Sequence, residues 1–333
     1  MYRETPKQWD KKEKWLDKAV KLRKEGYSYG YIAKQLKKHF NDEHDRKVED
    51  HIRRKVNKVI LGGDAESKES KPKVEVVQNL EPEIMEQRWK GCETIRFGLM
   101  GDTQFNSKYT QITHLYDFYQ LLKERGIKTV YHTGDMDEGE QMRPGHQYEC
   151  YNQGADDHVQ HIIDCYPKVK GITTYFITGN HDASLIKRAG YDLGRAIENA
   201  RDDLVYLGRD CAVVQLTPKC TMELRHPWDG SAYAISYKTQ KMIDAMSGGE
   251  KPNILAIGHY HKAEYIFYRN VHAFQTGTFQ AQTPFMRGKQ LSAHMGGWII
   301  ECQVDKKTGE LASVKSEFIP FYSAIKDDYK NWI

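Results

Sequence analysis

Four short apolar runs in this sequence each end in a glycine that is followed directly by residues of the kind that bind metal ions. One of them, the run 254–257, leads into Gly258-His259-Tyr260-His261. The other three lead into Gly101-Asp102-Thr103-Gln104, Gly134-Asp135-Met136-Asp137 and Gly179-Asn180-His181-Asp182. A short apolar run bounded by glycine is typical of a buried strand. The sequence therefore predicts a fold that brings four strand ends and their polar residues together.

The composition is that of a folded protein, with 39% hydrophobic and 11% aromatic residues. No apolar run approaches the roughly 20 residues that span a bilayer, and the charged N-terminus lacks a signal-peptide core. We therefore expect a soluble, cytoplasmic protein that makes no contact with a membrane. The six cysteines are scattered without a C-x-x-C pair, which indicates reduced thiols rather than disulfides.

Positive charge is concentrated at the N-terminus. Residues 1–60 hold 18 Lys and Arg against 10 Asp and Glu, whereas the rest of the chain holds 32 against 36. A basic segment attached to a mildly acidic body favours binding to nucleic acid or another polyanion.

Residues 1–60 have the pattern of three short helices. The first covers about 8–25, the second follows the capping residue Ser28, and the third opens at Asn41-Asp42 with Val48, Ile52, Val56 and Val59 on one face. A basic third helix after a tight turn is similar to a helix-turn-helix module, which binds DNA through that helix. The candidate DNA contacts are Arg46, Lys47, Arg53, Arg54, Lys55 and Lys58. The alternative is a small bundle whose charges are only solvated or which docks on a protein.

The remaining chain divides into a linker and a large domain. Residues 61–92 have the composition of a linker, and 81–92 suggest an extended or short helical lead-in. From Thr94 strand-like and helix-like runs alternate until about residue 200, and shorter strands follow. This order predicts an α/β domain over 93–333, with two packed sheets and helices outside them.

The residues at the four strand ends suit a pair of divalent metal ions. Ligands in α/β folds collect at the carboxyl ends of the strands, and carboxylate, amide and imidazole groups bind transition metals. Asp135 has two carboxylate oxygens and could bridge two ions. Such a pair clamps a phosphoryl group and supplies a bound hydroxide as nucleophile. His181 is the expected proton donor to the leaving oxygen.

The order of these motifs resembles the calcineurin-like binuclear metallophosphoesterases, whose pattern is D-x-H, G-D-x-x-D, G-N-H-D or G-N-H-E, an isolated His, and G-H-x-H. The resemblance covers about residues 94–320 and implies a four-layer fold of two mixed sheets between helices. It implies a first metal ion held by Asp102, Gln104, Asp135 and His261. It implies a second held by Asp135, Asn180, His226 and His259, with His181 as the catalytic acid. We expect Mn²⁺ at both sites, with Fe, Zn, Ni and Mg as alternatives.

Two positions depart from the family pattern. Gln104 stands where most members have histidine, so the first metal ion is expected to bind more weakly than the second. Glu138 stands where the family has an aspartate that orients the catalytic histidine, and Asp137 is its rival for that role. Arg143 and His146 follow in a loop from which they could reach a substrate phosphate.

The residues outside these motifs suggest ordinary structural roles. His132 is expected to be packed in the core, and His158 and His161 to lie on a solvated helix face rather than to form a metal site. A helix start at Gly230-Ser231 could present backbone N–H groups to an anion, with a plain helix cap as the equal alternative.

The sequence favours a metal-dependent phosphodiesterase, and more narrowly a nuclease recruited to DNA by residues 1–60. The second motif lacks the arginine of the protein Ser/Thr phosphatases, and GNHD is closer to the DNA-repair nuclease and phosphodiesterase branches. One alternative is a phosphodiesterase or phosphatase for small molecules. Another is a DNA-binding accessory subunit with a degenerate phosphoesterase body.

Overall fold

The computed structural model describes residues 14–25, 28–37, 40, 45–60, 83–86, 89 and 91–333. The chain divides into two compact units, Met1–Gln78 and Asn79–Ile333, and each is described by itself. The N-terminal part of the first expected helix, at 8–13, and the expected linker residues 61–80 lie outside the described residues.

The described part of the first unit contains three helices around a small core: α2 (Lys14–Lys24), α3 (Tyr29–Leu36) and α4 (Asp45–Ile60). Ser28 caps α3, since its hydroxyl accepts the Tyr31 N–H at 3.2 Å. The core combines residues from all three helices with Phe40: Trp15, Ala19, Ile32, Ala33, Leu36, Phe40, Val48, Ile52 and Val56. Val59, expected on the same face of α4, is instead 51% exposed.

Two mixed sheets form the second unit, each with six strands in the described part of the chain. The first sheet has the order β12-β11-β2-β3-β4-β5, with β2 to β5 parallel. Its strands are β2 (Thr94–Met100), β3 (Thr129–His132), β4 (Thr173–Thr178), β5 (Leu204–Arg209), β11 (Gly296–Val304) and β12 (Leu311–Pro320). The second sheet has the order β1-β6-β7-β8-β10-β9. Its strands are β1 (Glu83–Glu86), β6 (Cys211–Thr217), β7 (Cys220–Arg225), β8 (Ile254–Ile257), β9 (Ala263–Tyr268) and β10 (Val271–Thr276).

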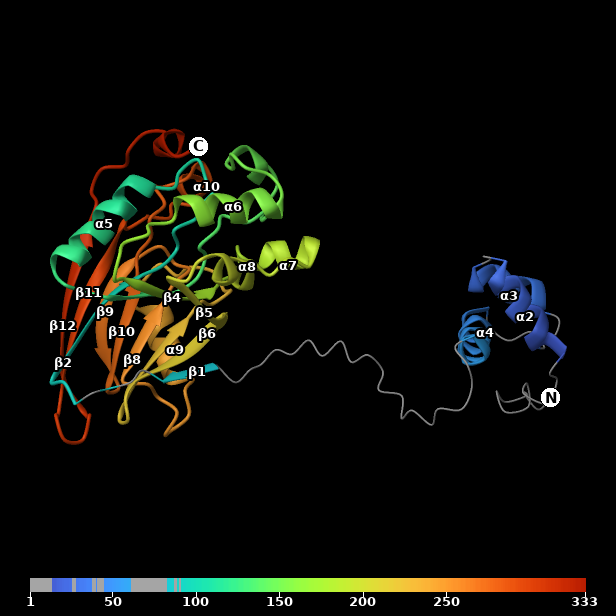
Figure 1. The fold of residues 1–333 in the computed structure, drawn as a ribbon, viewed down its shortest axis with the longest axis horizontal. Helices are drawn as coiled ribbons and strands as arrows, with labels where there is room; N and C mark the ends of the chain where they lie inside the picture. Colours follow the sequence, from blue (N-terminus) through green and yellow to red (C-terminus); the bar gives the residue numbers. More distant parts are fainter. Residues whose placement is uncertain are drawn as a thin grey trace. The chain divides into compact units, whose positions relative to one another are not determined.

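The two sheets pack face to face, and helices cover the outer face of each. Figure 1 shows the helices over the first sheet. The core between the sheets includes Leu99 and Ile300 from the first and Val214, Met222 and Phe274 from the second. The outer face of the first sheet is covered by α5 (Ile112–Glu124), α6 (Ala155–Cys165) and α8 (Leu193–Ala200), and that of the second by α9 (Tyr237–Asp244). These four layers confirm the expected fold class.

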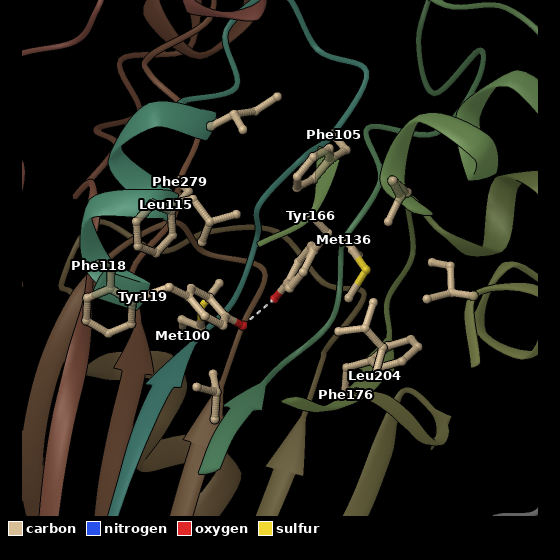
Figure 2. Packing of buried hydrophobic residues seen from close by; sticks show 14 of the residues in the cluster. Met100, Phe105, Leu115, Phe118, Tyr119, Met136, Tyr166, Phe176, Leu204 and Phe279 are labelled. Atoms are coloured by element: carbon tan, nitrogen blue, oxygen red, sulfur yellow. Dashed lines mark hydrogen bonds between the residues drawn. The ribbon is translucent and has the colours of Figure 1, made fainter. Parts of the chain in front are cut away.

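The core under α5 and α6 is rich in aromatic rings. Figure 2 shows Tyr119 and Tyr166 pointing toward each other among buried phenylalanines, with their hydroxyls 3.0 Å apart. Tyr119 also contacts the Thr174 hydroxyl at 2.6 Å. Both tyrosines are thus buried with their polar ends satisfied, as buried phenols require. This packing fixes α5 and α6 over strands whose carboxyl ends carry the predicted site.

Several elements differ from the sequence expectation. Residues 83–86, expected within the linker as an extended or short helical lead-in, are extended and form β1, which pairs parallel to β6 at the sheet edge. The expected helix at 183–200 is two helices, α7 (Ala183–Ala189) and α8, because Gly190 adopts φ 66° and ends the first. Strand β5 and the short helix α10 (Pro284–Gly288) were not expected.

The structure also describes the cysteines and the length and polarity of the helices. All six cysteines lie among the described residues and are free thiols. Of the described helices, none has the length and apolar character needed to cross a bilayer.

Candidate metal centre and catalytic site

The predicted ligands lie at the carboxyl ends of five strands that come from both sheets. Strands β2, β3 and β4 lead into Asp102, Asp135 and Asn180. Strands β7 and β8, which run parallel in the second sheet, lead into His226 and His259. Because the sheets pack face to face, their parallel strands deliver these side chains to one edge of the sandwich.

The backbone at this edge is unusual. Five predicted ligands have positive φ, a conformation uncommon outside glycine: Asp102, Gln104, Asp135, His259 and His261, with φ of 51°, 49°, 54°, 78° and 54°. The glycines next to them leave room for the side chains. A Cβ on Gly179 would lie 2.4 Å from Asp135 Oδ1 and 2.6 Å from His226 Nε2. The Gly motifs therefore serve close packing of the ligands as well as ending the strands.

The first ligand group joins Asp135, Asn180, His226 and His259. Asn180 Oδ1 lies 3.1 Å from His226 Nε2 and 2.9 Å from His259 Nδ1. Asp135 Oδ2 lies 3.1 Å from His226 Nε2. These four residues are the set expected for the second metal ion, and all four come together.

Main-chain carbonyls orient both histidines of this group. His226 Nδ1 lies 2.7 Å from the Thr133 oxygen, and His259 Nε2 lies 2.6 Å from the Asp229 oxygen. A carbonyl oxygen can only accept, so each neutral imidazole carries its proton on that side. The lone pairs of the other two ring nitrogens then point at the oxygens of Asn180 and Asp135. A divalent cation satisfies such a set of converging acceptors, and carbonyl-held imidazoles are typical of metal ligands.

The electrostatics of this group also suit a cation. Burial lowers the pKa of His226, but the Asp135 carboxylate outweighs it and raises the pKa to about 10. Burial and the adjacent His226 lower the pKa of His259 to about 4. Burial alone would raise the pKa of Asp135, yet His226 and His181 hold it below its ordinary value. The Asp135 carboxylate thus favours a positive charge beside it: a proton on His226 supplies that charge without a metal ion, and a bound cation would replace this proton.

The second ligand group joins Asp102, Gln104, Asp135 and His261. His261 Nε2 lies 3.3 Å from Asp102 Oδ1 and 3.4 Å from the Gln104 amide, and that amide lies 3.3 Å from Asp135 Oδ2. His261 Nδ1 is buried without a hydrogen-bond partner in the described part of the chain. This histidine thus lacks the carbonyl support that orients His226 and His259.

The amide of Gln104 has a better orientation with its oxygen and nitrogen exchanged. The nitrogen then donates to Glu138 Oε2 at 3.3 Å and to the Asp137 carbonyl at 3.2 Å. In this orientation the amide oxygen takes the position facing His261 and Asp135. Gln104 can therefore offer an oxygen ligand where the family pattern has an imidazole.

His181 borders both groups. Its main-chain N–H donates to Asp135 Oδ1 at 2.8 Å, and its ring nitrogen Nδ1 lies 2.6 Å from the main-chain oxygen of Glu138. Since that oxygen only accepts, Nδ1 carries the proton and Nε2 is left for the cavity that His181 lines. This is the arrangement that a proton-transferring histidine needs.

Glu138 contacts His181 through its main-chain carbonyl and not, as was expected, through its carboxylate. The Glu138 side chain contacts His146 Nε2 at 2.7 Å and accepts a hydrogen bond from Gln280, while only its carbonyl reaches His181. Asp137, the rival, accepts from Asn106 at 2.6 Å and contacts His158 Nδ1 at 2.8 Å. Neither carboxylate hydrogen-bonds to His181.

A cavity of about 360 Å³ opens beside the ligands, lined by Asp135, His181, His259 and His261 among others. Arg143 also lines it, as expected for a substrate contact, and its guanidinium lies 4.3 Å from the Phe285 ring centroid. His146, the other expected contact, is fully buried and holds Glu138 instead.

Two residues support the ligands from behind: the sequence signals the loop that holds Thr278, but it gives no sign of Gln280. Thr278 Oγ1 donates to the Asp102 carbonyl at 2.7 Å, and Gln280 lines the cavity and binds the Glu138 side chain. The loop Thr276-Gly277-Thr278-Phe279 signals its role only through its glycine, and Gln280 has no motif around it.

Three other expectations can be compared with the structure. His132 is buried in the core, as expected. His158 is not on a solvated face but fully buried against Asp137, and His161 Nε2 contacts the Tyr151 hydroxyl at 2.7 Å. No helix starts at Gly230-Ser231, because α9 begins only at Tyr237.

The candidate DNA contacts are described only in part. Arg53 and Arg54 are exposed on α4 and Lys55 is half-buried, and Arg53 donates to Glu49 at 2.8 Å. The side chains of Arg46, Lys47 and Lys58 lie outside the described residues. A DNA-binding role for this helix stays a prediction.

The sequence matches no protein-family model and no curated protein. Solved structures with a similar chain path include an archaeal phosphodiesterase, with 12% identity over 68% of this chain and 100% of that one, at a TM-score of 0.39. Vps29 from Entamoeba histolytica, complexed with Zn²⁺, has 16% identity over 68% of this chain and 99% of its own, at 0.33. A predicted phosphoesterase from Streptococcus pneumoniae has 15% identity over 69% and 99%, at 0.33. Proteins this distant can differ in activity, so function is inferred below from the site itself.

Proposed function

We propose that this protein is a metal-dependent phosphodiesterase that acts on DNA. The observation that carries the proposal is the convergence of His226, His259, Asn180 and Asp135 as facing acceptors, with His181 beside them. Such a donor set fits divalent ions, with Mn²⁺ as the first choice. Bound there, such ions would polarise a phosphate and lower the pKa of a water molecule.

The chain's own residues supply the remaining chemistry. The Glu138 carbonyl fixes the Nδ1 side of His181, which lines the cavity. When Nε2 is protonated as well, the imidazolium can give that proton to the leaving oxygen. Arg143 lies at the same cavity and offers a positive charge to the phosphate. The basic residues of α4 support DNA over other phosphodiesters, because positive charge on a helix face attracts the DNA backbone.

The test is cleavage of single-stranded DNA, duplex DNA and bis-p-nitrophenyl phosphate with Mn²⁺. We expect cleavage of the diester and of at least one DNA, and a loss of about 10²–10⁴-fold in His181→Ala, the usual contribution of a positioned acid. Cleavage of the small diester alone would indicate a small-molecule phosphodiesterase. No cleavage by a protein that binds metal would indicate an accessory subunit.

A further inference from the structure

The cavity beside the ligands has two exposed aromatic rings that the proposed chemistry does not use. Trp228 follows β7 and is 44% exposed, and Phe285 belongs to α10 and is 40% exposed. Both line the same cavity as His181 and the metal ligands. Aromatic rings that line a cavity with a few polar groups are typical of a ligand-binding site.

Each ring lies next to positive charge. Lys187 Nζ is 4.2 Å and the Arg209 guanidinium carbon 5.1 Å from the Trp228 ring centroid. Arg143 lies over Phe285 in the same way. A partly exposed ring with a cation beside it suits a nucleotide, because the ring can contact a base while the cation contacts its phosphate.

The two rings belong to different halves of the site. Trp228 precedes Asp229, whose carbonyl holds the metal-ligand histidine His259. The Phe285 ring lies under the Arg143 guanidinium, which is 3.9 Å from the Glu138 carboxylate. The main-chain carbonyl of Glu138 holds the proton donor, His181. Trp228 is thus next in the chain to a support of a metal ligand, and Phe285 is next in space to a cation near the residue that holds the proton donor.

We propose that the cavity binds single-stranded nucleic acid, with the bases on either side of the scissile phosphate stacked on Trp228 and Phe285. In a duplex each base is covered on both faces by its neighbours, so only an unstacked base can lie on a protein ring. This inference rests on the proposed function and deepens it by naming the substrate class. Single-stranded DNA and single-stranded RNA both supply the bases and phosphates that this cavity would bind.

Binding of a fluorescein-labelled hexanucleotide tests the inference. The parent protein is the full-length chain with His181→Ala, a substitution that slows cleavage of the strand during the measurement. Mn²⁺ is present so that the metal ligands are occupied. Excess unlabelled duplex saturates any duplex-binding surface of residues 1–60. Fluorescence anisotropy then measures the Kd for the strand in this parent and after adding Trp228→Leu or Phe285→Leu. Phe267→Leu is the matched control, because Phe267 is 57% exposed on β9 and does not line the cavity.

We expect each cavity variant to bind the hexanucleotide about tenfold more weakly, the range for loss of one base–aromatic stack, and the control to bind as the parent does. Leucine at these exposed positions should leave the melting temperature unchanged, which separates lost contact from lost folding. The assay is run with a DNA and with an RNA hexanucleotide, and the one that binds more tightly identifies the preferred strand. Either preference supports the inference.

Two outcomes would overturn it: the parent fails to bind the strand in the presence of duplex, or both cavity variants bind as tightly as the parent. Hydrolysis of bis-p-nitrophenyl phosphate by protein that retains His181 is measured separately. A protein that hydrolyses this diester but binds strands independently of both rings keeps the proposed function and loses this inference.

Discussion

At the scale of single residues, the two ligand groups differ in how firmly they are held. His226 and His259 are each fixed by a main-chain carbonyl, whereas His261 Nδ1 has no partner among the described residues. Outer-shell hydrogen bonds of this kind change metal affinity by roughly 10–100-fold. The group around His261 also depends on the amide of Gln104. It should therefore be the weaker site.

A Gln104→His substitution should tighten this weaker site. Imidazole is a better ligand than an amide oxygen for transition metals, and a gain of about tenfold is comparable to the effect of one outer-shell contact. Calorimetric titration of metal-free protein with Mn²⁺ should show two unequal sites in the wild type and closer affinities in the variant. Gln104→Ala is the control for loss of the side chain. Two equally tight sites in the wild type would contradict the assignment.

At the scale of elements, the strand ends place the ligands, and glycine makes their approach possible. Gly179→Ala should displace Asp135 and His226, since its Cβ would lie 2.4 Å and 2.6 Å from them. We expect metal affinity to fall by at least about tenfold with the protein still folded. Metal content after dialysis and circular dichroism measure the two effects. Gly288→Ala is the control, because nothing lies within 4 Å of a Cβ there.

The contact between α6 and the β3 loop predicts a pH-dependent stability. Burial lowers the pKa of His158, but Asp137 outweighs it and raises the pKa to about 9, above the ordinary value of about 6.5. The stabilisation is therefore complete below about pH 6.5 and is lost as the pH rises through about 9. Urea unfolding should show His158→Gln destabilised at pH 6 and close to wild type near pH 10. An equal difference at both pH values would rule out the charged pair.

Elements with a clear apolar run and a bounding glycine could be predicted from the sequence, and the rest could not. Strands β2, β4 and β8 were expected within a residue or so, because buried strands read as continuous apolar runs. The sequence left β1 open between an extended and a helical segment, because Glu83-Ile84-Met85-Glu86 is short and half charged and its pairing with β6 decides its structure.

The same division holds for the site. The metal ligands belong to short sequence motifs and could therefore be predicted from the sequence. Their supports at Thr133, Asp229 and Glu138 are main-chain carbonyls. Any residue type supplies such an oxygen, so no pattern in the sequence marks it. Only the fold shows which carbonyl reaches which histidine.

At the scale of the whole molecule, two units with separate cores divide the proposed work. The first has its core around Trp15 and Ile52, and the second between its two sheets. If α4 binds DNA, its exposed arginines should contribute through phosphate contacts. Affinity for duplex DNA should then depend on α4, and hydrolysis of a small diester should not.

Arg53→Gln with Arg54→Gln tests this division in the full chain. We expect weaker duplex binding and a salt slope lower by about two, since each lost phosphate contact removes about one unit. Lys18→Gln with Lys21→Gln on α2 removes the same charge from other exposed positions and serves as the control. Anisotropy at several salt concentrations measures both. Equal losses in the two double variants would argue against α4 as the DNA-contacting helix.

Because five ligands have positive φ, the residues that favour activity at these positions lower the stability of the fold. A non-glycine residue in this conformation costs about 1–3 kcal/mol when the surroundings hold it there. Glycine at Asp102, Asp135 or His259 would relieve that cost while removing a ligand. A lineage that no longer needed hydrolysis would thus gain stability by losing the site, and its descendants should carry glycine or asparagine at these positions first. None of the five positions carries glycine in this chain, so each keeps a side chain that can offer a metal ligand.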